Sequence, residues 1–312
     1  MNLMEKRMNF SPTVFHITHH KAGSQWVAEI LKYCALERFQ RPDVDLSFFY
    51  NTPIKPETVY LTVYVPKKDF EHVTACDPRL SWQGIKYSMG HPQLYMKNWV
   101  NFQMKRIPCR RFIVIRDLRD TLVSLYFSWK ISHVFHFPWQ FKSRELLSES
   151  TEEQGLLYWI GEGERTRFDG RFNPPFLKAQ YDLMNHSKAN DIVAFLKKIL
   201  DYIADIQVSW IHDDSLLIRY EDLIADEIGV FERIVDHCQI PVSRDRLHEI
   251  IRYNRFETVT GRQRGEENIQ AHQRKGIAGD WRNYFSETIK NKFKARFGEV
   301  LIKTGYEKDL NW

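Results

Sequence analysis

Long apolar segments are missing from this sequence of 312 residues. The N-terminal stretch MNLMEKRMNF lacks the apolar core of a signal peptide, and no later apolar run reaches the ~20 residues of a membrane-spanning helix. We therefore expect a cytoplasmic protein that is not anchored in a membrane. The chain also has no internal repeat, no low-complexity segment and no linker rich in proline and glycine. These absences predict a single domain over residues 1–312.

Cysteine is equally scarce, because the chain has only four and no two of them form a CxxC pair. Scattered thiols indicate reduced cysteines in the cytoplasm and give no reason to expect a zinc site. No run of lysine and arginine stands out either, since basic and acidic residues are interleaved although the net charge is +5. This balance suits a small anionic ligand and does not favour nucleic acid.

What the chain does have is short β-rich segments separated by helical patterns. The segment FIVI at 112–115 is apolar throughout, which is typical of a strand buried on both faces of a parallel sheet. The other predicted strands are 13–18, 58–65 and 216–220. The predicted helices are 25–39, 121–131, 153–160, 189–206, 226–238, 243–252 and 287–304. Strands that alternate with helices predict an α/β fold in which helices flank a central parallel sheet.

The segment HHKAGSQW at 19–26 follows the first predicted strand and leads into a helix. Such a turn can bind phosphate, because the first backbone N–H groups of a helix have no partner within it and the helix dipole favours an anion. The residues that could contact a nucleotide here are Lys21, Gly23, Ser24, Gln25 and Trp26. A P-loop of the form GxxxxGKS is absent, and the same segment could be an ordinary turn with a solvated lysine.

A second strand–turn–helix junction, RDLRDTLVSLY, comes directly after FIVI. Arg116 could bind a phosphate through two parallel hydrogen bonds, and Ser124 lies two helical turns further on the same side. The alternative is a salt-bridged helix start in which Asp117 and Asp120 pair with Arg116 and Arg119. Two phosphate sites in one domain would imply a nucleotide that carries phosphates at two places.

Two later segments add candidate contacts. Arg274 and Lys275 lie in the glycine-containing loop RKGIAG, whose N–H groups could surround an anion, although a solvated basic loop would have the same sequence. Tyr220 is expected at the carboxyl end of the fourth strand, where ligands bind in parallel sheets, but it could equally be a packing residue.

Taken in order, the four segments resemble the sulfotransferase family that uses 3′-phosphoadenosine 5′-phosphosulfate (PAPS). HKAGSQW is similar to the family's 5′-phosphosulfate loop, written PKSGTTW, and RDLRDTLVSLY to its 3′-phosphate segment. RYEDL and RKGIAGDW are similar to two later blocks. The resemblance implies a sulfotransferase fold like that of the P-loop nucleotide kinases, PAPS as donor and no metal. It also implies sulfuryl transfer to a hydroxyl or amine of a small molecule, possible acceptors including natural products.

The resemblance further assigns roles to residues at matching positions. Lys21 would contact the bridging oxygen of the phosphosulfate and assist the leaving phosphate. The implied 5′-phosphate contacts are Ala22, Gly23, Ser24 and Gln25, with Ala22 and Gln25 in place of hydroxyl residues of the family pattern. The implied 3′-phosphate contacts are Arg116, Ser124, Arg274, Lys275 and Gly276. The implied adenine contacts are Trp26, Tyr220, Asn254 and Phe256.

The sequence leaves open which residue takes the proton of the acceptor. Cytosolic animal members of the family carry a catalytic histidine in a KTHLP-like stretch, which is not recognisable here; Lys86 and His91 match it poorly. Other candidates are His20 with His19 behind it, His133, His136 and a carboxylate. We predict Lys21, His20 and His133 as the catalytic residues.

Two further interpretations remain. One is a kinase with a degenerate phosphate loop. A kinase should carry a Mg²⁺-binding aspartate at a strand end and a GKS or GKT loop, and this chain shows no convincing pair of these features. A sulfotransferase-like protein could instead bind a nucleotide or a partner without turnover. The sequence does not indicate an oligomeric state.

Overall fold

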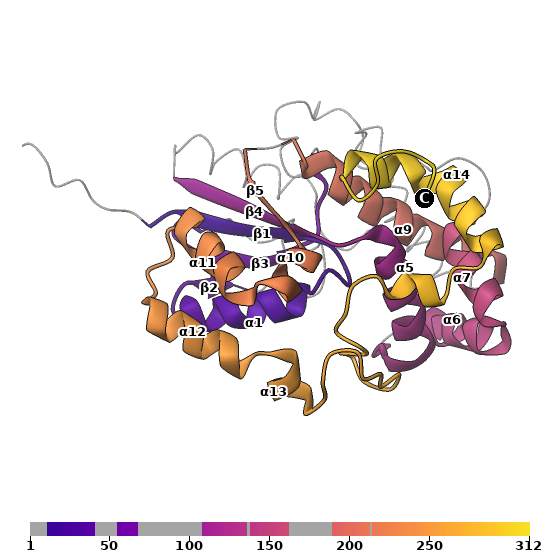
Figure 1. Ribbon diagram of the computed structural model, residues 1–312, viewed down its shortest axis with the longest axis horizontal. Coiled ribbons are helices and arrows are strands. Elements are labelled where there is room, and N and C mark those ends of the chain that lie inside the picture. Colours follow the sequence, from indigo (N-terminus) through magenta and orange to yellow (C-terminus); the bar gives the residue numbers. More distant parts are fainter. Residues whose placement is uncertain (1–10, 41–54, 68–107, 136–137, 162–188, 213) are drawn as a thin grey trace, which may run out of the picture.

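A parallel sheet forms the centre of the molecule (Figure 1). The computed structural model describes residues 11–40, 55–67, 108–135, 138–161, 189–212 and 214–312. Within them, five strands pair in the order β2-β3-β1-β4-β5, and all neighbours are parallel. The strands are β1 (Thr13–Thr18), β2 (Phe39–Gln40), β3 (Val59–Val63), β4 (Cys109–Ile115) and β5 (Leu216–Arg219). The expected α/β fold with a central parallel sheet is therefore confirmed.

The middle strand, β1, is buried along its whole length. β4 beside it is buried over its last four residues, the FIVI segment. A strand covered on both faces needs apolar side chains or polar ones that are hydrogen-bonded. Thr18 meets this requirement, because its hydroxyl donates to the carbonyl oxygen of Val114 at 2.9 Å.

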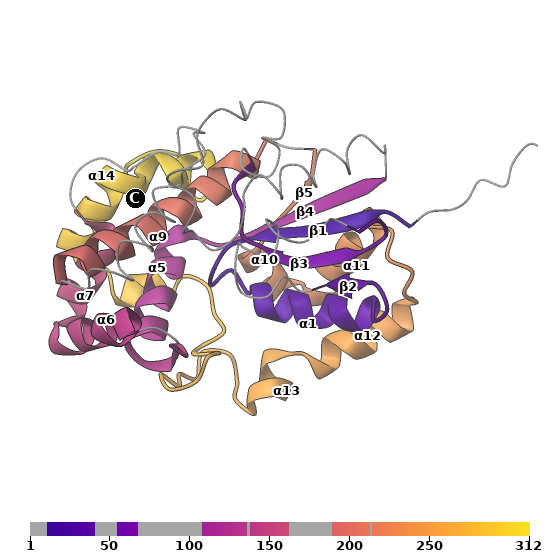
Figure 2. The same ribbon diagram turned by 180° about the vertical axis from the view of Figure 1, so that it is seen from behind.

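Two groups of helices lie around the sheet (Figures 1 and 2). Helices α1 (Ser24–Cys34), α10 (Tyr220–Ala225), α11 (Glu227–His237) and α12 (Arg244–Tyr253) share one hydrophobic core with the strands. Helices α5 (Leu118–Phe127), α6 (Pro138–Glu149), α7 (Glu152–Ile160), α9 (Ala189–Trp210) and α14 (Glu287–Lys303) build a second core beyond one end of the sheet. Because α1 follows β1 and α5 follows β4, the predicted phosphate turns lie where the two groups meet.

The observed boundaries differ from the predicted ones where backbone geometry overrides side-chain pattern. The helix predicted over 25–39 ends at Cys34, because Ala35 leaves the helical conformation. Tyr220 is the first residue of α10 and not the last of β5, since acidic residues after it favour a helix start. The sequence analysis missed the short elements β2, α6, α10 and α13 (Phe256–Thr260), the short 3₁₀-helix at Asp280–Asn283 and the single π-helical turn at Ser128–Ser132.

Cysteine and membrane predictions can be compared with the described part of the chain. Cys34 and Cys238 are free thiols, whereas Cys76 lies outside the described residues. No helix among the described residues combines the length and apolarity needed to span a bilayer.

Candidate nucleotide-binding and active site

The turn between β1 and α1 has the backbone geometry of an anion site. Lys21 has a φ of 67° and Gly23 a φ of 77°, both in the left-handed region. A Cβ on Gly23 would lie 2.8 Å from the Tyr220 ring, so glycine is needed for space as well as for conformation. Gly23 caps α1 without a side-chain hydrogen bond, and the first turn of α1 holds no acidic residue. The start of α1 is thus left open to a negative group.

The side chains within this turn have different surroundings. Ala22 is fully buried in the core, so only its backbone faces the turn, whereas Gln25 is exposed. The hydroxyl of Ser24 hydrogen-bonds the hydroxyl of Tyr64 at 2.7 Å.

Lys21 is a half-buried cation that is repelled by other cations. Burial, followed by repulsion from Arg116 and Arg274, lowers the pKa of Lys21 from 10.5 to about 8. Repulsion thus reaches Lys21 from two arginines that lie far from it in the sequence. An anion bound here would reduce the energetic cost of the charge on Lys21.

Arg116 joins the predicted segments. Its guanidinium donates to the carbonyl oxygens of Lys21 at 3.1 Å and Ile277 at 3.0 Å, and lies 4.5 Å from the centroid of the Tyr220 ring. Its Nε is buried and has no hydrogen-bond partner among the described residues. Arg116 thus holds together the turn after β1, the start of α10 and the loop that contains Ile277, and keeps a donor available.

Unlike at the start of α1, side chains accept hydrogen bonds from three backbone N–H groups around the start of α5. The N–H of Arg116 donates to Nε2 of His19 at 3.3 Å, and the N–H of Asp117 donates to Glu221 at 3.1 Å. The N–H of Arg119 donates to the Asp117 carboxylate at 2.9 Å. Side chains thus cap these three N–H groups, so phosphate binding here would depend on other donors such as the Arg116 side chain, and it stays a prediction. The predicted pairing of Arg119 with Asp117 is observed at 2.7 Å.

Residues 273–281, here called the basic loop, are fixed to α5 by Asp120. Its buried carboxylate accepts hydrogen bonds from the N–H groups of Gly279 at 2.6 Å and Trp281 at 2.9 Å. Ser124 follows Asp120 by one helical turn, so it lies on the side of α5 that carries this contact. A phosphate site shared by Ser124 and the basic loop stays a prediction.

The two cations of the basic loop are paired with acids. The Arg274 guanidinium forms ion pairs with Asp280 and Glu267 and lies 4.5 Å from the centroid of the Phe127 ring. The Lys275 ammonium contacts Asp280 at 2.8 Å. A phosphate would have to compete with these carboxylates for both side chains.

The predicted adenine contacts lie next to the basic loop. Gly276 has a φ of 66°, and a Cβ there would lie 2.6 Å from the Phe256 ring. Trp26 packs edge-on against Phe231, and the Arg264 guanidinium lies 5.5 Å from the centroid of a Trp26 ring. Arg264 also donates to the Gly276 carbonyl at 3.3 Å, so it links Trp26 to the basic loop. The sequence analysis missed Arg264, because Trp26 lies far from it in the chain.

Asn254 has a local role at the end of α12. Its side-chain nitrogen donates to the Ile250 carbonyl at 2.9 Å, which closes the helix. A contact between Asn254 and adenine stays a prediction.

The predicted catalytic residues lie near one another. Burial, followed by repulsion from His133 and Lys21, lowers the pKa of His20 to about 4. The His20 ring is 4.5 Å from that of Tyr64, and the His133 ring stacks on Trp129 at 5.7 Å. At neutral pH, His20 is therefore an uncharged group that can accept a proton. Lys86, His91 and His136 lie outside the described residues.

Tyr64 is the residue of this group that the sequence analysis missed. It follows β3 directly, and β3 is the neighbour of β1. The carboxyl ends of adjacent parallel strands lie side by side, so its position after a strand was the available signal.

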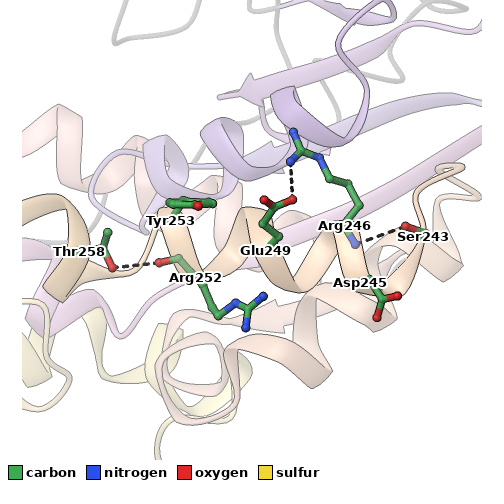
Figure 3. A pocket seen from close by; sticks show the side chains of 7 residues that line it. All are labelled: Ser243, Asp245, Arg246, Glu249, Arg252, Tyr253 and Thr258. Atoms are coloured by element: carbon green, nitrogen blue, oxygen red, sulfur yellow. Dashed lines mark hydrogen bonds and ion pairs between the residues drawn. The ribbon is translucent and has the colours of Figure 1, made fainter.

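A cavity of about 690 Å³ on α12 and α13 lies apart from this site (Figure 3). It is lined by Ser243, Asp245, Arg246, Glu249, Arg252, Tyr253 and Thr258. Arg246 and Glu249 pair with each other, and Thr258 donates to the Arg252 carbonyl. None of the predicted site residues lines this cavity.

Comparison with known proteins assigns the family. A family model described as the sulfotransferase domain matches residues 11–305. The chain therefore belongs to the sulfotransferase family. Among the described residues, no cluster of three or more His, Cys, Asp or Glu side chains could hold a metal ion.

Individual relatives are distant. Sulfotransferase 2A2 of Rattus norvegicus is 25% identical over 295 residues, which cover 91% of this chain and 82% of that protein. A flavonol sulfotransferase-like protein of Flaveria bidentis is 26% identical over 215 residues, 63% of this chain and only 56% of that protein's length. The structure of mouse sulfotransferase SULT7A1 complexed with PAP aligns over 93% of this chain and 84% of that one, with 16% identity and a TM-score of 0.48.

Proposed function

We propose that this protein, as one sulfotransferase domain over residues 1–312, transfers a sulfuryl group from PAPS to a hydroxyl or amine of a small molecule, with natural products among the candidates. The observation that carries the proposal is the position of Arg116 between the Lys21 turn and the basic loop, where no described residue accepts a hydrogen bond from its Nε. A nucleotide with phosphates at both its 5′ and 3′ positions would contact both segments at once. We further propose that the protein acts in the cytoplasm.

The residues fit such a donor by charge and by space. Its 5′ end would be held by Lys21 and by the open start of α1, and its 3′-phosphate by Arg116 and Ser124 with help from the basic loop. Trp26 and Phe256 would hold the base, near Tyr220. When bound, the donor supplies a sulfuryl group that passes in line to the acceptor.

The protein's own part in the reaction is to position groups and to balance charge. The protonated Lys21 would stabilise the negative charge that develops on the leaving phosphate. Neutral His20, with the Tyr64 ring beside it, would accept the proton of the acceptor, and His133 is the alternative base. The aromatic rings of Trp129 and Phe135 next to His133 would form part of the acceptor side.

Thermal shift with 3′-phosphoadenosine 5′-phosphate (PAP), 5′-AMP and ATP tests the donor. A ligand at ~100 times its Kd adds about 2.7 kcal/mol of stability, which is readily measured. We expect strong stabilisation by PAP that is lost in Arg116→Lys, which keeps the charge but not the two parallel donors.

The matched control is Arg296→Lys, because Arg296 also forms a buried ion pair, with Asp201 at 2.7 Å, but in the second core. This variant should lower stability without changing nucleotide preference. Equal or better stabilisation of the wild type by ATP would refute the PAPS proposal and favour a kinase. PAP binding without sulfation of any acceptor would indicate a binding protein without turnover.

A further inference from the structure

His19 stands at the end of β1 in a single defined protonation state. It is fully buried, and burial is the main reason that its pKa falls to about 3. Its Nδ1 lies 2.8 Å from the His20 carbonyl oxygen, which can only accept, so Nδ1 carries the proton. Its Nε2 therefore accepts, and the N–H of Arg116 donates to it at 3.3 Å. His19 thus connects the backbone of the Lys21 turn with the backbone of Arg116.

Gln207 of α9 completes this connection. Its side-chain nitrogen donates to Nε2 of His19 at 2.9 Å and to the carbonyl oxygen of Arg116 at 2.7 Å. Both neighbours can only accept, which fixes the orientation of the amide. The peptide groups on both sides of Arg116 are thus held, one through its N–H and the other through its C=O.

Packing alone does not explain why position 207 carries an amide. The residue is fully buried, and its Oε1 has no hydrogen-bond partner among the described residues. An apolar side chain of similar size would avoid this unpaired acceptor, but it would leave the Arg116 carbonyl and Nε2 of His19 without the donor that Gln207 supplies. The amide at this position therefore serves these two acceptors.

We propose that His19 and Gln207 are positioning residues that set the spacing between the two phosphate-binding turns. Lys21 lies two residues after His19, and the guanidinium of Arg116 extends from the backbone that Gln207 holds. A donor with two phosphates gains from both turns only when their separation matches its own. The inference rests on the proposed function, in which one ligand spans both turns.

The test is the gain in affinity that a 3′-phosphate provides. Calorimetry gives the Kd of PAP and of 5′-AMP for the wild type and for Gln207→Met, which removes the two donors at similar length. We expect the PAP preference to fall by about tenfold, since displacement of positioned groups by ~1 Å has effects of this size or larger. The Kd of 5′-AMP should change less than twofold, because a single phosphate does not depend on the spacing.

Ser209→Ala is the control on the same helix. The Ser209 hydroxyl accepts a hydrogen bond of 2.9 Å from the N–H of Lys67, which belongs to neither phosphate-binding turn. It should lower the melting temperature and leave the PAP preference intact. If Gln207→Met does not fold, Gln207→Asn gives the same readout, since its shorter amide cannot reach both partners. A lower melting temperature with an unchanged PAP preference in the Gln207 variant would overturn the inference and leave the proposed function standing. A wild type that does not prefer PAP to 5′-AMP would overturn both.

Discussion

Lys21 is the cation whose removal tests the electrostatics of the site most directly. Its pKa is lowered from 10.5 to about 8, by burial first and by Arg116 and Arg274 second. At ~1.4 kcal/mol per pKa unit, the folded protein without an anion holds the charged lysine at a cost of roughly 3–4 kcal/mol at most. Lys21→Met keeps most of the apolar chain and removes this cost. We therefore expect the variant to be more stable than the wild type at pH 7 and to lose PAP binding.

The pH dependence of this stability gain has a defined sign. Between pH 8 and 10.5, unfolded Lys21 binds a proton that the folded form has lost, so wild-type stability rises with pH in this window. The advantage of Lys21→Met should thus be largest below pH 8 and disappear towards pH 10.5. Chemical denaturation of both proteins from pH 6 to 10.5 measures the difference. The control is Lys32→Met on α1, which loses a partly exposed pair with Glu29 and contacts with the Tyr33 and Phe39 rings.

Two results would refute this reasoning. One is a Lys21→Met variant that is less stable than the wild type at pH 7, because it would mean that the charge is already neutralised within the folded protein. The other is a stability difference that stays constant across the pH range.

Two further predictions concern the loop anchor and the proton acceptor. Asp120→Asn, which weakens the two hydrogen bonds to the basic loop, should destabilise the protein by about 1–3 kcal/mol in thermal unfolding and weaken PAP binding; unchanged PAP binding would argue against a role for this anchor. His20→Asn should lower kcat much more than His133→Asn if His20 is the base, and the reverse result would assign His133. With the pKa of His20 about 4 and that of Lys21 about 8 in the free protein, kcat/KM should fall below about pH 4 and above about pH 8.

Local sequence was sufficient for the elements whose pattern is short-range. FIVI and the strand at 13–18 are apolar or β-branched segments, and both form buried parallel strands where predicted. The turn after β1 was predicted from Lys21 and Gly23, because a left-handed glycine before a helix is a local requirement. The boundaries of short elements such as α10 were missed, since few residues contribute to their pattern.

By itself, the sequence determined the parallel α/β fold and the order of the four segments that belong to the sulfotransferase family. Which groups remain available to a ligand depends on long-range contacts that exist only in the tertiary structure. Glu221, 104 residues from Asp117, caps the start of α5, and Gln207, 188 residues from His19, holds the turn after β1. Sequence periodicity carries no information about such contacts, because each depends on strands and helices that meet only after the sheet has formed.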